Sequence, residues 1–311
     1  MSFSRRETLA LLTSTIALTA CGASDSRPVL KVGSQRGSTK AVMLSSDALA
    51  GAPYRVEWSE FPAAQPLLEA IGSGVIDLGL AGDAPFLFAY QSGSPIQAVS
   101  AQMVLPRPHG AVSLIVPPKS PARSIADLKG KKVATTRGSI GHFLTLRALA
   151  EAHLPFDYVQ FTWLSPGDTK AAFGSGSVDA WATWGPYVIG AMNDGAKVIA
   201  DGYDLINGYA FEVANEQAIK TKGSLLTDFA AREAKALAWS LGHKSEYARV
   251  LAAETGLPLE ITAVIADRYS RQSIPIDDRA IADQQVVLDI FRASGDIKVA
   301  RPLDLAFHRI V

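Results

Sequence analysis

The sequence predicts an α/β fold in which two lobes are joined by two crossover strands. Strand-like runs and helical stretches alternate from residue 29 to about residue 208, and this order favours parallel sheets over a β-sandwich. The strand, turn and helix pattern starts again near residue 124, and the chain is mainly helical from residue 224 onward. We therefore expect the first lobe to contain both chain ends, with a ligand between the lobes.

The first part of this pattern contains three strand, loop and helix units. The strand-like runs end at glycines such as Gly33 and Gly82, and the apolar residues Leu67, Leu68 and Ile71 fall at helical spacing. The expected strands are 29–33, 54–58 and 76–80, and the expected helices are 39–49, 63–71 and 84–91.

The second part repeats the order. A β-branched run at 112–116 ends at two prolines, and Ser124 stands three residues before Asp127, the spacing of a capping box. Helical breaks are expected at Gly242, 256–258 and 273–275. The remaining expected strands are 132–136, 159–164, 180–183 and 198–200, and the helices between them are 140–153 and 168–173.

Residues 1–21 have the composition of a signal peptide. Two arginines precede the apolar stretch 9–20, which is too short to span a bilayer. Residues 18–21 read Leu-Thr-Ala-Cys, which resembles a bacterial lipobox, so we expect a lipid anchor on Cys21; both the general secretory and the twin-arginine export routes stay open. Cys21 is the only cysteine, which excludes a disulfide or a cysteine nucleophile from the body of the protein.

The rest of the chain divides into a linker and two lobes. Residues 22–28 form the polar linker, 29–112 and 214–311 the first lobe, and 113–213 the second lobe. With 311 residues and 48% hydrophobic content, each lobe has enough apolar surface for its own core.

The balanced charge limits the classes of partner. The chain has 30 basic and 30 acidic residues, so no overall field is available to hold a nucleic acid. We expect a monomer in which any bound anion is held by local geometry.

Several motifs in a fixed order resemble aliphatic-sulfonate-binding proteins of ABC importers, a branch of the type II periplasmic-binding fold. They include Glu60-Phe61-Pro62, Gly82-Asp83-Ala84-Pro85, and the segments 125–134 and 179–187, and together they cover roughly residues 29–215. The resemblance implies two lobes that close on a small organic anion in the periplasm or at the cell surface. It also implies delivery to a permease with its cytoplasmic ATPase, with no cofactor and no chemistry on the ligand.

Three strand-to-helix turns could supply donors to a sulfonate, at 35–39, 82–84 and 138–142. A sulfonate carries three acceptor oxygens, and the first N–H groups of a helix are unpaired and lie at the positive end of its dipole. The resemblance places the ligand at the first turn. The candidate contacts are Gln35, Arg36, Gly37, Ser38, Gly82, Asp83, Ser139 and His142.

Each of these candidates also has a structural interpretation. Ser38 and Ser139 are suited to capping a helix, and His142 could be a capping or surface histidine. Asp83 would repel an anion, so it is expected either to cap the next helix or to pair with the cation of an amine-bearing ligand. The family has Gly-Ser-Ser-Ser-His where this chain has Ile140 and Gly141 in place of two serines, so two hydroxyl donors are lost.

Aromatic residues cluster near the end of a predicted strand. Trp181, Trp184 and Tyr187 either form core or line the cleft, where an indole N–H can donate to an anion while the ring packs an organic tail. Gly185 stands where the family usually has Asp. Glu60 is a further candidate, because taurine would need a carboxylate such as Glu60 or Asp83 in the cleft.

Alternative functions on this fold are the binding of nitrate, bicarbonate, a pyrimidine or taurine, a sensor domain, and an enzyme like the desulfinases of aromatic sulfinates. Those enzymes rely on a cysteine that this chain lacks outside Cys21. Its five histidines show no metal-ligand spacing. The sequence therefore predicts a binding protein with no catalytic or metal site.

Overall fold

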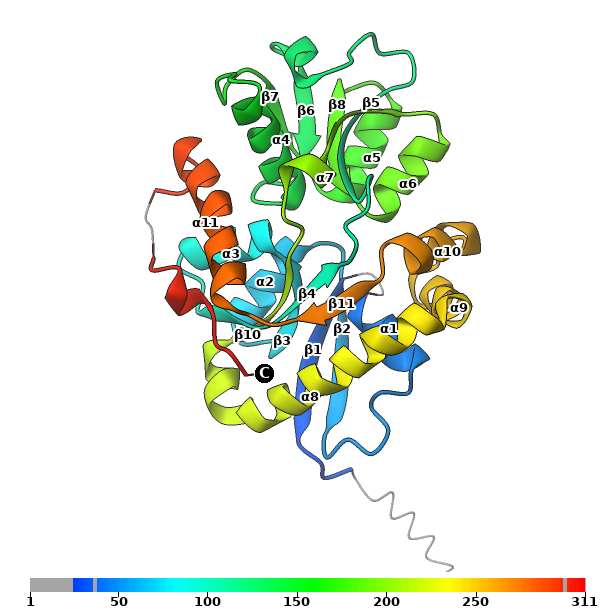
Figure 1. Cartoon of the computed structure of the whole chain (residues 1–311), viewed down its shortest axis with the longest axis vertical. Helices are drawn as coiled ribbons and strands as arrows, with labels where there is room; N and C mark the ends of the chain where they lie inside the picture. The colour runs from blue at the N-terminus through cyan, green and yellow to red at the C-terminus, as the bar shows by residue number, and fades with distance from the viewer. Residues whose placement is uncertain (1–24, 36–37, 299–300, 311) are drawn as a thin grey trace, which may run out of the picture.

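The computed structural model describes residues 25–35, 38–298 and 301–310, which form two lobes, each built on its own β-sheet (Figure 1). This confirms the predicted two-lobe α/β fold. The signal peptide with Cys21, most of the linker, and Arg36 and Gly37 of the first turn lie outside the described residues, so the expectations for them stay predictions.

The first lobe contains a six-stranded mixed sheet in the order β11-β4-β10-β3-β1-β2. Strand β1 pairs in parallel with β2 and β3, whereas β10 runs antiparallel between β3 and β4. The strands are β1 (Val29–Gln35), β2 (Arg55–Phe61), β3 (Leu78–Gly82), β4 (Ile96–Val104), β10 (Ala210–Asn215) and β11 (Arg271–Ile274). The helices are α1 (Thr39–Ser45), α2 (Ala64–Gly72), α3 (Asp83–Gln91), α8 (Glu216–Gly242), α9 (Lys244–Thr255), α10 (Leu259–Arg268) and α11 (Asp278–Ala293).

The second lobe contains a five-stranded sheet in the order β7-β6-β8-β5-β9. Its strands are β5 (Val112–Val116), β6 (Lys132–Thr135), β7 (Gln160–Trp163), β8 (Ala180–Trp184) and β9 (Lys197–Asp201). Its helices are η1 (Ile125–Leu128), α4 (Ile140–Glu151), α5 (Pro166–Gly174), α6 (Pro186–Asn193) and α7 (Gly202–Leu205), and a short η2 (Asp304–Ala306) follows near the C-terminus. The predicted capping box at Ser124 and Asp127 is confirmed.

The strands β4, β10 and β11 differ from the sequence prediction. All three pair with antiparallel partners in the first sheet, so residues 210–213, which were assigned to the second lobe, belong to this sheet. Only neighbours far away in the sequence define these strands, which is why their own residues did not reveal them.

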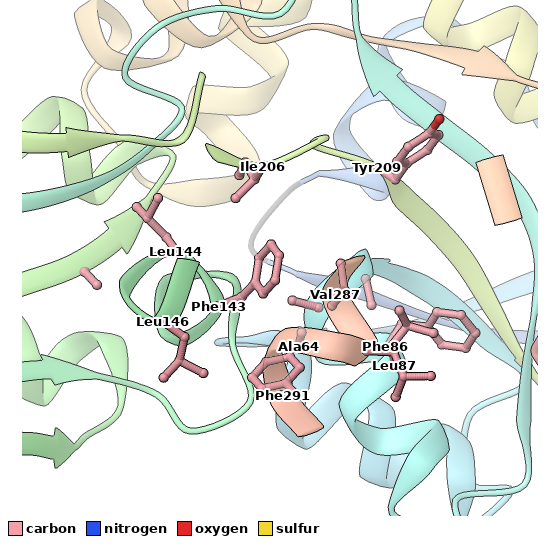
Figure 2. Close-up of a cluster of buried hydrophobic side chains, with 14 of the residues drawn as sticks. Ala64, Phe86, Leu87, Phe143, Leu144, Leu146, Ile206, Tyr209, Val287 and Phe291 are labelled. Carbon is pink, nitrogen blue, oxygen red and sulfur yellow. The ribbon is translucent and has the colours of Figure 1, made fainter. Parts of the chain in front are cut away.

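The chain crosses from the first lobe to the second at 105–111 and returns at 206–209. Helix α11 makes a third connection, because it packs against both α3 and α4 (Figure 1). Figure 2 shows Phe291 of α11 beside Phe143 of α4, and the two ring centroids are 5.9 Å apart. Phe88 of α3 meets the same Phe291 ring at 5.3 Å, so one apolar cluster continues from lobe to lobe.

Within the described residues, no helix is both long enough and apolar enough to cross a membrane.

Candidate functional site

A cavity of about 310 Å³ lies between the lobes. This volume falls in the range of small-molecule sites. Helices and strand ends of the first lobe form one side, and the ends of β8, α4 and α7 form the other. Predicted site residues that line it are Gln35, Ser38, Gly82, Ser139, Trp184 and Tyr187, and those that do not are Glu60, Asp83, His142 and Trp181.

The first turn of α4 faces this cavity with open donors. Ser139 is the N-cap, and its Oγ accepts a hydrogen bond from the His142 backbone N–H at 3.2 Å. The N–H groups of Ile140 and Gly141 come before the first intrahelical bond and have no acceptor within the helix. The turn therefore offers two aligned backbone donors beside residues that line the cavity.

The hydroxyl hydrogen of Ser139 is also available. Thr135 Oγ1 donates to the backbone oxygen of Ala182 at 2.9 Å, and Thr135 Oγ1 and Ser139 Oγ are 3.2 Å apart. Because the Thr135 hydrogen is engaged with Ala182, the Ser139 hydrogen can point to Thr135 or to a ligand.

Gly141 explains one departure from the family pattern. A Cβ at Gly141 would lie 2.4 Å from the Ala182 oxygen and 2.5 Å from Thr135 Oγ1, so no serine fits against this part of β8. Ile140, in place of the other serine, lines the cavity with an apolar side chain.

The first turn of α3 faces the same cavity but has no free donors. The Asp83 N–H donates to the Tyr209 oxygen at 3.1 Å, and the Ala84 N–H donates to Asp83 Oδ1 at 2.7 Å. The next residue, Pro85, has no N–H. The expectation that this turn would donate to an anion is therefore wrong, and Gly82 contributes only a surface to the cavity.

Asp83 is fully buried behind this turn, and Gly82, not Asp83, is the N-cap of α3. Burial raises the pKa of the Asp83 carboxyl to about 7, although hydrogen bonds from backbone N–H groups act in the opposite direction. Its Oδ2 has no hydrogen-bond partner. Asp83 is thus neither a contact of a bound anion nor a counter-charge in the cavity.

The first turn of α1 contributes side chains to the cavity. Ser38 lines the cavity, and its Oγ is buried and has no partner. Gln35 engages one hydrogen of its side-chain amide with the Leu80 oxygen at 2.5 Å, which leaves the second hydrogen for other acceptors. Thr39 Oγ1 donates to Glu212 Oε1 at 3.3 Å.

The aromatic cluster divides between cavity and core. Trp184 and Tyr187 line the cavity, whereas Trp181 is buried against Phe173 and Tyr187, with ring centroids 5.7 and 5.8 Å away. Gly185 has a φ of +55°, a backbone region that strongly favours glycine. An Asp would be strained there, which accounts for its absence.

His142 and Glu60 point elsewhere. The His142 Nδ1 accepts from the Gly138 N–H at 3.2 Å, and its Nε2 lies 3.4 Å from a carboxylate oxygen of Asp296, beyond the end of α11. Burial lowers the pKa of His142 to about 4, against the opposing effect of Asp296, so the ring is neutral at pH 7. Glu60 lies on β2 with its carboxylate 4.0 Å from Lys40 Nζ.

Sequence reasoning missed the wall formed by the C-terminal helices. Glu233 of α8 has a sequence signal, because it falls at helical spacing between the apolar Leu226, Phe229 and Leu237. The missed lining residues include Gln102, Glu233, Leu237, Tyr247, Leu251, Leu257, Ile265, Tyr269 and Arg271.

Among the described residues, no three His, Cys, Asp or Glu side chains gather as ligands for a metal ion.

Comparison with known proteins agrees with this geometry. A family model described as NMT1/THI5 like matches residues 59–247. An aliphatic sulfonates-binding protein of Escherichia coli K12 is 36% identical over 277 residues, which are 88% of this chain and 86% of that protein.

Two crystal structures are similar over nearly the whole chain. The periplasmic aliphatic sulphonate binding protein SsuA from Escherichia coli has 33% identity and a TM-score of 0.75, with 89% of this chain and 93% of that chain covered. The alkanesulfonate-binding protein SsuA from Xanthomonas axonopodis pv. citri, bound to MOPS, has 31% identity and a TM-score of 0.83, with 91% and 99% covered.

Proposed function

Since this chain belongs to the NMT1/THI5-like family, we propose that it is the periplasmic binding component of an ABC importer and captures an organosulfonate between its lobes. The names of similar proteins support this cargo: the Escherichia coli matches are described as aliphatic sulfonate-binding, and the Xanthomonas axonopodis protein binds MOPS, itself a sulfonate.

The observation that carries the proposal is the combination of donors and apolar walls in one cavity. The open first turn of α4, with Ser139, supplies donors for the three sulfonate oxygens. Ser38 adds a hydroxyl from the opposite lobe. Leu237, Leu251 and Ile265 supply a surface for an organic tail.

These walls favour an organosulfonate over nitrate. Nitrate has no apolar part, so it would gain nothing from the leucine and isoleucine side chains that line the cavity. A ligand with a carbon chain buries that surface, at about 0.8 kcal/mol for each CH₂ group.

Binding without chemistry is part of the proposal. The only cysteine is Cys21, so the nucleophile of a desulfinase is missing from the lobes. His142, which stands next to the donor turn in sequence, does not line the cavity. Its Nδ1 accepts a hydrogen bond from the Gly138 N–H, and its Nε2 lies buried 3.4 Å from Asp296. It is therefore not positioned as a base.

Export and anchoring complete the proposal. A cleaved signal peptide and a lipid on Cys21 would hold a monomer at the membrane, close to a permease driven by a cytoplasmic ATPase. The support for the anchor is the sequence Leu-Thr-Ala-Cys at residues 18–21.

A thermal-shift screen of the protein lacking residues 1–21 tests the proposal. Alkanesulfonates should raise the melting temperature in a concentration-dependent way, because a ligand that binds only the folded state stabilises it. Nitrate and bicarbonate at the same concentrations should have much smaller effects. The proposal fails if no sulfonate shifts the transition, or if nitrate shifts it more than every sulfonate does.

A further inference from the structure

The inner wall of the cavity contains a buried pair of carboxyl groups. Glu233 of α8 is 2% exposed and lines the cavity, and Glu212 of β10, which is fully buried, lies behind it. The two side chains interact with each other and with the Thr39 hydroxyl. Acidic side chains are almost never fully buried without a partner, so this pair calls for an explanation.

Among the described residues, three atoms of this carboxyl pair and its neighbour are buried without a hydrogen-bond partner of good geometry. They are Oε1 of Glu233, Oε2 of Glu212 and Nε2 of Gln102. The Gln102 side chain, on the neighbouring strand β4, is also 2% exposed and lines the cavity. A buried polar group without a partner costs about 1–3 kcal/mol. Oε1 of Glu233 is an acceptor on the cavity wall, which indicates that a donor group of the ligand completes it. The Gln102 amide is itself a donor and interacts with the Glu233 carboxylate.

The charged groups around the pair do not fully neutralise two ionised carboxylates. Arg271 of β11 interacts electrostatically with both carboxyls and with the Tyr247 hydroxyl of α9, and Thr39 and Gln102 are the neutral groups nearby. Two carboxylates and one guanidinium sum to a net charge of −1. Burial raises the pKa of Glu212 well above its usual range and also raises that of Glu233, so burial favours a proton shared by the pair.

The carboxyl pair is close to the donors for the sulfonate head. Ser38, with its free hydroxyl, directly precedes Thr39, whose hydroxyl donates to Glu212 at 3.3 Å. Consecutive Cα atoms are about 3.8 Å apart. Ser38, Ser139 and Glu233 all line this one cavity of about 310 Å³, so a ligand small enough to fill it can place its anion beside the serines and reach the Glu233 carboxylate with a short carbon chain.

We propose that Glu233, backed by Glu212 and flanked by Gln102, binds the ammonium group of a short aminoalkanesulfonate. The ammonium replaces the proton shared by the two carboxyls, and this proton leaves to the solvent. The inference rests on the proposed function, since it assigns the second end of a ligand whose first end is a sulfonate. Neither Glu60 nor Asp83, the carboxylates considered from the sequence, lines the cavity.

Calorimetry with a matched pair of probes tests the inference on the purified protein. 2-Aminoethanesulfonate and ethanesulfonate differ mainly in the ammonium group. We expect 2-aminoethanesulfonate to bind at least tenfold more tightly at pH 7. Titrations in two buffers of different ionisation enthalpy should show the release of about one proton for each 2-aminoethanesulfonate bound and none for ethanesulfonate.

The variant Glu233→Gln removes the charge and keeps the shape. It should lower the affinity for 2-aminoethanesulfonate at least tenfold more than the affinity for ethanesulfonate. Glu246→Gln, at an exposed carboxyl of α9, is the matched control and should leave the ratio of the two affinities unchanged.

The outcomes separate this inference from the proposed function. If ethanesulfonate binds as tightly as 2-aminoethanesulfonate and no proton is released, the ammonium subsite is wrong while sulfonate capture stands. If neither probe nor any longer sulfonate binds, both proposals fail. Because the proton release is measured on the unmodified protein, the result does not depend on whether the Glu233 variant folds.

Discussion

The first turns of α3 and α4 face one cavity, and both follow a strand in the same strand-to-helix arrangement. In α4, Ser139 caps the helix with its side chain and leaves the Ile140 and Gly141 N–H groups open. In α3, the Tyr209 oxygen and the Asp83 carboxyl take the corresponding N–H groups. The dipole alone therefore does not make a helix start an anion site; its first N–H groups must also be free.

The chemistry of two residues explains the difference. The Asp83 carboxyl accepts a hydrogen bond from the Ala84 N–H, so this donor is not available to an anion in the cavity. Pro85 removes a further donor. At α4 the corresponding positions are Ile140, Gly141 and His142, which bring no charge into the cavity and no ring in place of an N–H.

The largest expected effect comes from placing a carboxylate at the first turn of α4. Both Ser139→Asp and Ser139→Asn keep a residue that caps helices well. The aspartate, however, puts a carboxylate near the sulfonate, and two unit charges 4 Å apart repel by about 4 kcal/mol at an effective dielectric of 20. Alkanesulfonate affinity measured by calorimetry should fall at least a hundredfold further in Ser139→Asp than in Ser139→Asn.

The neutral variant serves as the control for folding, since both variants should unfold at similar temperatures without ligand. Equal affinities in the two variants would mean that the anion does not lie at the α4 turn. The free N–H groups of α4 would then not explain anion binding.

A smaller effect is expected at α3, on stability. The folded state raises the pKa of Asp83 from 3.8 to about 7, so the folded protein binds a proton that the unfolded chain releases between these values. The free energy of unfolding therefore decreases as pH rises from about 4 to 7. Asp83→Asn should remove this loss and be more stable than the unmodified protein at pH 8 by about 2 kcal/mol. This is less than the roughly 4 kcal/mol that the full pKa shift corresponds to, because the uncharged amide must also be buried there.

Urea unfolding at pH 5 and pH 8 measures this difference. At pH 5 the advantage of Asp83→Asn should be clearly smaller than at pH 8, and it should vanish only below about pH 4, where the carboxyl is protonated in both the folded and the unfolded state. An advantage that is the same at both pH values would show that the Asp83 carboxyl does not titrate as its burial implies.

Local sequence patterns predicted the fold well where an element is defined by its own residues. The strand, turn and helix units, the capping box at Ser124 and the two-lobe organisation are confirmed, and so is the resemblance to sulfonate-binding proteins. Strands β4, β10 and β11 were missed or misplaced, because their pairing depends on antiparallel neighbours more than 60 residues away in the sequence.

The sequence predicted the cavity residues that lie in turns before helices, but not the buried contacts or the residues supplied by distant helices. Ser38 and Ser139 line the cavity as expected, since a turn before a helix can be read from adjacent residues. The hydrogen bond of Asp83 to Ala84 and the rotation of His142 away from the cavity depend on packing in three dimensions. Glu233 comes from a distant helix, and only an acidic residue on an apolar face hinted at it.

The smallest expected effect distinguishes Ser38 and Ser139, which line the cavity from different lobes. Ser139 is engaged as a helix cap, whereas Ser38 Oγ has no partner in the described structure. Ser38→Ala should therefore change the free energy of unfolding of the unliganded protein by no more than about 0.5 kcal/mol, so its unfolding temperature should stay nearly the same. It should lower alkanesulfonate affinity by about three- to tenfold, because one hydrogen bond to a charged group, worth about 1 kcal/mol or slightly more, is lost.

Ser139→Ala, by contrast, should lower both the stability of the unliganded protein and the alkanesulfonate affinity, since the α4 cap contributes about 1 kcal/mol to stability. If Ser38→Ala destabilised the unliganded protein as much as Ser139→Ala does, Ser38 would have a structural partner, and the first lobe would contribute no free hydroxyl to the anion.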